Sequence, residues 1–358
     1  MTSNPTEAAS FKTIDAGTLS ASAGLSGGLW SDVWKRFQRN PIALAGFYVV
    51  CFLVFIALFA DFIANDKPYY LEYRGKTYFP ILRSYIVDVD LGRWPAELLN
   101  VDFKKLQGAK AVFPPIPYRG TGINLLEPLE PPSIRHWFGT DKLGRDVMAG
   151  MVHGSRISLS IGFVAVGIAV IIGVILGAIA GYFGSWADLV ISRLFEIMLS
   201  IPTFFLLITV AALLPPSIFL TMAIIGMTSW VGIARFTRNE FLRIRNQDYV
   251  TSAIALGVTD RNVMFRHILP NALAPVIVSV VLGIAGAILV ESSLSFLGIG
   301  VPAQLVTWGS ILREASSTTF AWWLAVFPGF AIFITVLAYY LVGEGLREVL
   351  DPRLRGLR

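Results

Sequence analysis

Long apolar stretches alternate with polar segments along the 358-residue chain. A helix rises 1.5 Å per residue, so about 20 apolar residues cross the hydrocarbon core of a bilayer. Apolar stretches of about this length lie at residues 42–63, 157–183, 188–214, 218–234, 272–291 and 321–343. The pattern therefore predicts an all-α polytopic membrane protein with six transmembrane helices.

The chain before the first span has two parts. Residues 1–28 are rich in Ser, Ala, Gly and Thr without a sustained apolar core, so we expect a disordered tail rather than a signal peptide. Residues 29–40 place apolar side chains on one helical face and charged side chains on the other, which predicts a cytoplasmic interfacial helix. Basic residues in this helix precede the first span, residues 41–63, and therefore favour a cytoplasmic N-terminus.

Residues 64–152 form a long polar insertion between the first two spans. Nine of the 19 prolines fall here, and no apolar stretch is long enough to cross a membrane. Residues 69–73 and 76–79 flank Arg74-Gly75, a pattern typical of a β-hairpin. We expect a small extracytoplasmic lobe of α/β or irregular structure, because loops longer than about 60 residues are exempt from the charge rule.

Residues 235–270 form the main polar interruption of the remaining chain, and their excess of arginine predicts a cytoplasmic loop. The loop has a helical pattern. Asp248 can cap a first short helix, and Gly257 can end it in the left-handed conformation. Asp260 offers a second helix start, and Pro270 interrupts the second helical pattern.

Single residues refine this picture of the spans. Gly173, Gly177 and Gly181 share one helical face, so another helix can approach closely there. Pro202 predicts a kink in the third span. Glu291 lies near the outer end of the fifth span, and an ionisable residue in a span is a candidate for the translocation path or a gate. A snorkelling or helix-pairing role for Glu291 is the alternative.

Composition agrees with a membrane protein, since the chain is 55% hydrophobic, only 15% charged, and has a mean hydropathy of +0.65. Its net charge of +5 is explained by the cytoplasmic segments, without nucleic acid as a partner. Cys51 is the single cysteine, and His136, His153 and His267 are far apart in the sequence. We therefore expect no disulfide framework, no metal site and no enzymatic activity.

Residues 138–146 resemble a phosphate-binding loop only in part. Gly139 and Gly144 have the required spacing, but the Lys and Ser/Thr that reach phosphate and magnesium are missing. We expect instead an ion-pair cluster of Asp141, Arg145 and Asp146 at the membrane surface.

The predicted cytoplasmic loop, residues 235–270, resembles a segment of a known protein family. Residues 248–257, Asp-Tyr-Val-Thr-Ser-Ala-Ile-Ala-Leu-Gly, and residues 266–271, Arg-His-Ile-Leu-Pro-Asn, resemble the cytoplasmic "EAA" loop of bacterial ABC-importer permeases. Residues 138–146 are similar to the segment that precedes the second span in the dipeptide/oligopeptide branch. The large lobe after the first span most resembles the Yej type of peptide permease.

This resemblance implies the type I importer-permease fold, with residues 153–358 as the core permease domain. It implies a peptide importer in the inner membrane, with both termini cytoplasmic. Its partners are then a second homologous permease subunit, two ATP-binding subunits that carry ATP-Mg, and an extracytoplasmic solute-binding protein; this chain needs no cofactor. The implied ATPase-coupling residues are Asp248, Tyr249, Val250, Thr251, Ser252, Ala253, Leu256, Gly257, Leu269 and Pro270.

Two alternatives remain open at this point. Another small solute, such as a nickel chelate, could replace peptide as the cargo. A secondary transporter or channel would also be polytopic, but it is expected to carry charged groups or interrupted helices near the midplane. The nearly uncharged interiors of the predicted spans favour a path that is driven from outside the chain.

Overall fold

The computed structural model describes residues 31, 33–99, 101–106 and 108–350. Five helices are long and apolar enough to cross a membrane, and α6 with α7 adds a sixth when this bent pair is counted as one span. The membrane domain is built from α2 (Pro41–Leu58), α5 (Val147–Phe183), α6 (Ser185–Ser200), α7 (Thr203–Leu213), α8 (Ile218–Arg245), α11 (Leu269–Phe296) and α13 (Trp323–Leu350). The expected all-α polytopic fold with a small lobe is confirmed.

The lobe contains a three-stranded antiparallel sheet with the order β2-β1-β3. The expected hairpin is present as β1 (Tyr70–Tyr73) and β2 (Lys76–Tyr78), and Arg74 and Gly75 turn it with φ angles of 50° and 73°. The third strand, β3 (Lys110–Val112), was not predicted. The end of the predicted first span forms a separate short helix, α3 (Ala60–Ile63), which leads into the lobe. The lobe also holds α4 (Pro80–Asp88), η2 (Ala96–Leu98) and η3 (Phe103–Lys105).

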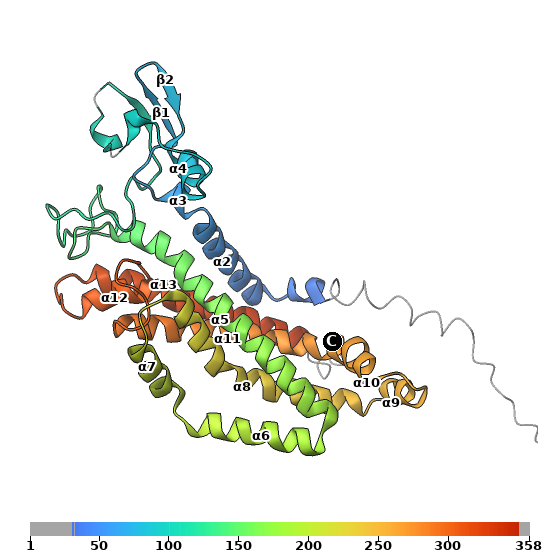
Figure 1. The fold of residues 1–358 in the computed structure, drawn as a ribbon. Helices are drawn as coiled ribbons and strands as arrows, with labels where there is room; N and C mark the ends of the chain where they lie inside the picture. The colour runs from blue at the N-terminus through green and yellow to red at the C-terminus, as the bar shows by residue number, and fades with distance from the viewer. Residues whose placement is uncertain (1–30, 32, 100, 107, 351–358) are drawn as a thin grey trace, which may run out of the picture.

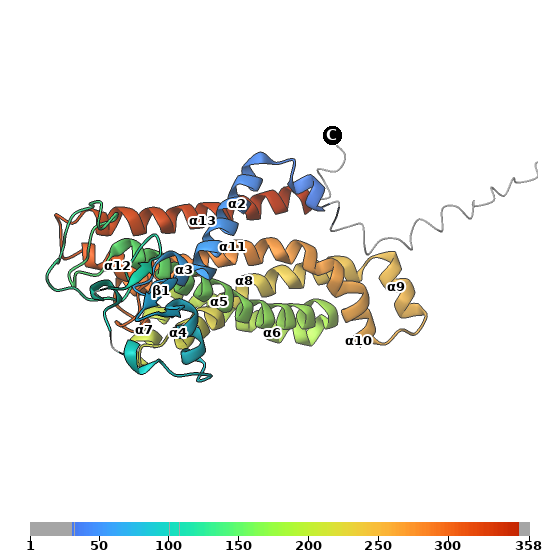
Figure 2. The same cartoon turned by 90° about the horizontal axis from the view of Figure 1, so that it is seen from above.

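The two polar parts of the chain lie at opposite ends of the helix bundle (Figures 1 and 2). The lobe and α12 (Trp308–Ala315) form one end, called here the lobe end. The other, called the loop end, is formed by α9 (Asp248–Ala255) and α10 (Asp260–Asn262). Phe37 and Ala43 pack beside Gly345 near the end of α13, so the beginning of α2 and the end of α13 lie together.

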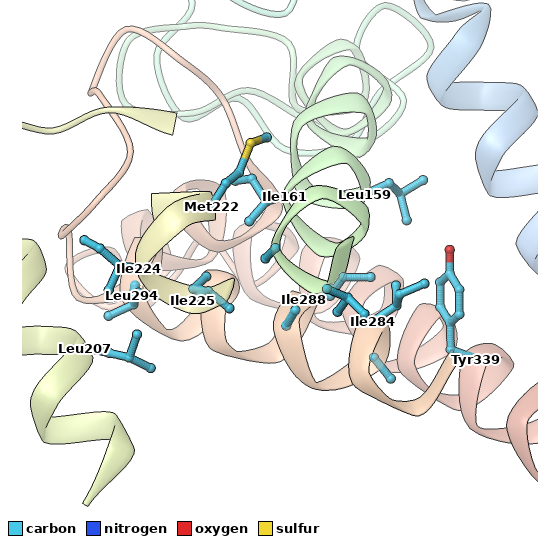
Figure 3. Close-up of a cluster of buried hydrophobic side chains, with 14 of the residues drawn as sticks. Leu159, Ile161, Leu207, Met222, Ile224, Ile225, Ile284, Ile288, Leu294 and Tyr339 are labelled. Carbon is cyan, nitrogen blue, oxygen red and sulfur yellow. The ribbon is translucent and has the colours of Figure 1, made fainter. Parts of the chain in front are cut away.

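The hydrophobic core lies where α5, α8 and α11 meet (Figure 3). Ile161, Ile225 and Ile288, one from each helix, are fully buried there. Gly162 allows the close approach, because a Cβ at this position would lie 2.9 Å from Cγ1 of Ile288. Since these side chains interlock, the three helices form one packed unit.

Glycines also bring α5 and α8 together along their length. A Cβ added to Gly177 would lie 2.4 Å from the carbonyl oxygen of Ala234, and one added to Gly181 would lie 2.6 Å from that of Arg238. Gly173 meets Ile233 in the same way, at 2.9 Å. The face predicted from spacing is therefore the face that packs against α8.

Several element boundaries differ from the predicted ones; the first span, for example, ends as α2 at Leu58, and α8 continues past residue 234 to Arg245. Helix α5 begins at Val147, before the expected start at residue 157, because Asp146 caps it by accepting the backbone N–H of Ala149. The end of the predicted 64–152 lobe thus belongs to α5. Pro202 separates α6 from α7 by a 78° bend, a larger break than the predicted kink.

At the N-terminus, the predicted interfacial helix of residues 29–40 is described only in part. Residues 33–37 are helical, and the buried Phe37 stacks on Trp34 with ring centroids 5.8 Å apart. The predicted tail, residues 1–28, lies outside the described residues.

Candidate coupling site

Helix α9 forms the tip of the loop end. Its inner face is apolar, since Val250 is fully buried and Ala253 is 8% exposed. These side chains join a buried cluster from the end of α5, the end of α8 and the helix that follows α9. Its other members are Ala178, Tyr182, Phe241, Ile244, Val263, Ile268 and Ala272. Helix α9 is therefore fixed to the bundle by a small hydrophobic core of its own.

The rest of the surface of α9 is open and partly apolar. Tyr249 and Ile254 are 42% and 43% exposed, and Leu256 just after the helix is 85% exposed. Thr251 and Ser252 are also exposed, and the Thr251 hydroxyl donates to the carbonyl oxygen of Asp248 at 3.0 Å. The helix thus presents large apolar side chains on a rigid support.

Gly257 turns the chain after α9. Its φ is +79°, in the left-handed region predicted from the sequence, and nothing lies within 4 Å of a Cβ built there. Its N–H donates to the carbonyl of Ile254, while the N–H of Val258 donates to that of Ala253. This paired pattern is the Schellman end of a helix, which satisfies two otherwise free carbonyl groups.

The predicted cap at the start of α9 is wrong. Gln247 occupies the N-cap position without a side-chain hydrogen bond, and Asp248 is the first residue inside the helix. There its negative charge still favours the helix, because the N-terminal turn carries a partial positive charge. Thr259 precedes Asp260 at the second start and likewise makes no side-chain capping bond.

The second short helix does not end at Pro270. Residues Asp260–Phe296 form one helix of 37 residues, in which α10 continues through a π-helical turn, η4 (Val263–Ile268), into α11. The N–H of Leu269 donates to the carbonyl of Met264, five residues back. Pro270 follows this wider turn near the start of α11, where a residue without an N–H is tolerated. The prediction that Pro270 interrupts the helix is therefore corrected.

Polar contacts fasten α9 to this long helix. The Tyr249 hydroxyl donates to the carbonyl oxygen of His267 at 3.3 Å and accepts from Asn271 Nδ2 at 3.2 Å. Asn271 also donates to the carbonyl of His267 at 2.9 Å. Burial raises the pKa of Tyr249, so the phenol stays protonated and keeps its donor role. Leu269 completes the contact from the apolar side.

Three more contacts connect the loop to α5 and α6. The Tyr182 hydroxyl at the end of α5 donates to Asp260 Oδ1 at 2.6 Å, and the Arg245 guanidinium lies 5.7 Å from the centre of the Tyr182 ring. Arg238 of α8 binds Asp188 of α6, with Nη2 2.6 Å from Oδ2. Sequence reasoning missed these pairs, because their partners lie 50 and 78 residues apart.

Glu291 lies inside the bundle. It is 0% exposed, and its carboxylate accepts hydrogen bonds from Ser295 at 2.7 Å and from Ser158 of α5 at 3.2 Å. Gly309 of α12 sits against the same turn, since a Cβ there would lie 2.5 Å from the carbonyl oxygen of Ser292. This arrangement supports the helix-pairing alternative, and a gate role for Glu291 stays a prediction.

Residues 138–146 fold into a polar loop at the lobe end. Asp141 accepts backbone N–H groups of Leu143 and Arg145 and pairs with the Arg145 guanidinium, whose Nη2 also lies 2.7 Å from Glu314 Oε1. Burial raises the pKa of Glu314. Asp146 does not join this pair as expected, because it caps α5 and lies 2.8 Å from His136 Nδ1.

These features define a class of protein. A bundle with up to six membrane spans carries, at one end, a short helix with a glycine elbow that is held by its own core and presents an apolar face. A short helix with exposed apolar side chains suits contact with a partner protein, and the fold is the one expected of an importer permease.

Comparisons with known proteins identify the family. Residues 173–356 match the family described as binding-protein-dependent transport system inner membrane component, and residues 28–80 match the N-terminal TM domain of oligopeptide transport permease C. The first match spans more than half of the chain. The chain therefore belongs to the family of binding-protein-dependent transport system inner membrane components.

Relatives are similar over nearly their whole length. The dipeptide transport system permease protein DppC of Alkalihalophilus pseudofirmus is 33% identical over 91% of this chain and 90% of its own. The peptidoglycan transport system permease protein YejE of Agrobacterium fabrum is 33% identical over 89% of this chain and 92% of its own. The oligopeptide transport system permease protein OppC of Bacillus subtilis is 32% identical, with coverages of 91% and 90%.

Proposed function

We propose that this chain is the permease subunit of an ATP-binding-cassette importer for peptides. It forms half of a translocation path beside a second homologous permease subunit. Two ATP-binding subunits drive the path, and an extracytoplasmic solute-binding protein delivers the peptide. Support for the cargo comes from the relatives, whose names refer to dipeptides, oligopeptides and, in Pectobacterium atrosepticum, glutathione.

The observation that carries this proposal is the surface of α9. Tyr249, Ile254 and Leu256 are exposed, while Val250 and Ala253 behind them are buried. An amphipathic helix with apolar anchors on its free side fits a groove on a partner protein. Since α9 is packed against α8 and α11 through one buried cluster, a movement of the ATP-binding subunit reaches both spans.

Energy enters from the partners in this proposal, because the chain's own candidate phosphate loop lacks the Lys and Ser/Thr. ATP-Mg then binds only to the ATP-binding subunits. The purified chain alone should hydrolyse no ATP, whereas the reconstituted complex should take up peptide when ATP is supplied. Hydrolysis by the chain alone would contradict this assignment. Mass spectrometry of copurified subunits and of the ligand on the binding protein identifies partners and cargo.

We propose that the chain lies in the inner membrane with both termini and the loop end in the cytoplasm. The arginines of the loop end favour this orientation, because basic residues collect on the cytoplasmic side. Single cysteines at Lys76 and Arg243, in a Cys51→Ser background, test this. Both native side chains are well exposed, at 66% and 53%, so access depends on the side of the membrane. An impermeant maleimide should label position 76 in spheroplasts and leave position 243 unlabelled. Labelling of position 243 would reverse the topology.

The lobe has a separate proposed role, docking of the solute-binding protein. It lies at the end of the bundle opposite α9, where cargo arrives in this orientation (Figure 1). Deleting residues 69–78 removes β1 and β2 and should weaken binding-protein association while the ATP-binding subunits still assemble. Unchanged docking and transport would instead favour an insertion with no role in transport.

A further inference from the structure

Three side chains with metal-binding atoms converge in the lobe beside the start of α5. Glu127, Glu130 and His136 each place one ligand atom within 4.8 Å of the others. A folded-back loop holds them, since the N–H of Thr140 donates to the carbonyl of Glu130 and the Thr140 hydroxyl donates to the carbonyl of Glu127. Spacing along the sequence did not predict this cluster, because His136 is the only histidine in the loop.

The imidazole of His136 is fixed in one orientation. It is 2% exposed, and its Nδ1 lies 2.8 Å from Oδ2 of Asp146. Asp146 is itself fixed, because its other oxygen accepts the N–H of Ala149 at 2.7 Å. The Tyr118 ring packs on the imidazole with centroids 4.5 Å apart. A carboxylate that accepts from one ring nitrogen leaves the other nitrogen as a ligand, as it does behind metal-binding histidines.

That other nitrogen faces a carboxylate instead of a donor. His136 Nε2 lies 3.4 Å from Glu127 Oε2, and both atoms are acceptors when the Nδ1 proton is directed at Asp146. A metal ion between the two atoms would satisfy both acceptors, and a second proton on the imidazole is the alternative. Ligands held 2.0–2.2 Å from a tetrahedral zinc ion lie about 3.3–3.6 Å apart. The 3.4 Å between His136 Nε2 and Glu127 Oε2 matches this value, and the three ligand atoms together lie within 4.8 Å of one another. Asn124 Nδ2 holds the same Glu127 oxygen in place at 2.7 Å.

We propose that Glu127, Glu130 and His136 bind a divalent transition-metal ion, with Zn²⁺ as the preferred one, and that Asp146 orients the histidine. One nitrogen and two carboxylates suit zinc, whereas Ca²⁺ and Mg²⁺ take oxygen ligands throughout. The two glutamates neutralise the charge of the ion. Glu127 and His136 also line a cavity of about 820 Å³, so water or a further ligand can complete the coordination.

Zinc titration of the purified full-length chain tests this proposal. The chain is stripped with a chelator and freed of any histidine tag, and Zn²⁺ binding is measured by calorimetry. We expect one ion per chain. Glu130→Gln should weaken binding at least tenfold, and Glu72→Gln, a lobe carboxylate paired with Lys110, should leave it unchanged.

A variant behind the cluster separates metal binding from folding. Asp146→Asn keeps a residue that can cap α5, so the helix start is retained. It should still weaken zinc binding about 10- to 100-fold, because the orienting carboxylate is lost. X-ray absorption of the zinc-loaded chain should show only nitrogen and oxygen ligands.

Two results would overturn the proposal. One is the absence of stoichiometric zinc binding by the native chain. The other is equal affinity of the native chain and Glu130→Gln, with thermal unfolding showing that both are folded. In either case a proton occupies the space between His136 and Glu127, and the cluster is a charged hydrogen-bond bridge. The test measures no transport and is therefore independent of the proposed cargo.

Discussion

The two ends of α5 are held by different kinds of contact. At the lobe end, Asp141 and Asp146 are 5% and 3% exposed and are bound by Arg145, His136 and backbone N–H groups. At the loop end, Tyr182 binds Asp260, whose helix start is exposed. Opening the first set leaves buried charge unpaired, at a cost of several kcal/mol, whereas opening the second does not. The polar contacts at the lobe end are therefore the harder ones to open, and this end is called the anchor of α5.

The largest loss of transport should come from a change at the loop end. Gly257→Val places a β-branched residue at φ +79°, so the elbow is strained although space is available. We expect transport in proteoliposomes to be abolished, by uncoupling or by loss of the ATP-binding subunit, while the chain still inserts. Gly257→Asn is the control, because Asn adopts the left-handed conformation, and it should retain transport. Full transport by Gly257→Val would contradict a coupling role for this elbow.

Breaking the anchor should reduce stability rather than coupling. Arg145→Leu leaves Asp141 and Glu314 without their cation, and we expect a loss of about 3–5 kcal/mol, measured by thermal unfolding in detergent. Arg193→Leu is the matched control, because it breaks an ion pair whose side chains are 68% and 60% exposed. That change should cost less than about 1 kcal/mol. Equal losses in the two variants would remove the distinction between the ends of α5.

Removing the hydrogen bond at the loop end of α5 should have a smaller effect, on the coupling of transport to ATP hydrolysis. Tyr182→Phe removes only the hydroxyl that donates to Asp260, worth about 1 kcal/mol. We expect less peptide transported per ATP hydrolysed, with little change in thermal stability. Tyr340→Phe, at a side chain 56% exposed in α13, is the control. An unchanged transport ratio in Tyr182→Phe would show that this bond does not contribute to coupling.

The smallest effect concerns pH and the hairpin of the lobe. The Tyr78 hydroxyl and Lys76 hold the pKa of Glu97 below its ordinary value. Ionised Glu97 therefore stabilises the hairpin at pH values above about 4.3, the ordinary pKa of a glutamate. This stabilisation is lost as the pH falls through the lowered pKa of the folded state. Hydrogen exchange at residues 76–78 should therefore show protection at pH 6 that declines in acid. In Glu97→Gln the protection should not change with pH over this range.

Much of the membrane domain could be predicted because its signals are local. Apolar stretches of sufficient length indicated the spans, Pro202 the break between α6 and α7, and Gly257 the left-handed turn. The glycine face of α5 was also readable, since a period of four residues places Gly173 and Gly177 on one side of a helix.

What could not be predicted depends on contacts between distant parts of the chain. Asp146 was assigned to the Arg145 pair, but folding brings it to His136 and to the start of α5. Pro270 predicted a helix end because proline has no N–H and usually interrupts a helix. The helix continues because Pro270 follows a π-helical turn, where the missing N–H is tolerated. Strand β3 is short and pairs with a segment about forty residues earlier, so no local pattern indicates it.

The π-helical turn has a mechanical consequence. Because the helix is not interrupted at Pro270, the surface loop and the fifth span form one continuous helix of 37 residues, about 55 Å long. If this helix tilts as one body, one degree at the Asp260 end moves the Phe296 end by about 1 Å. In the proposed transport cycle, we therefore expect a partner that displaces α9 to move the fifth span directly, through a helix that carries a π-helical turn and Pro275 but no break.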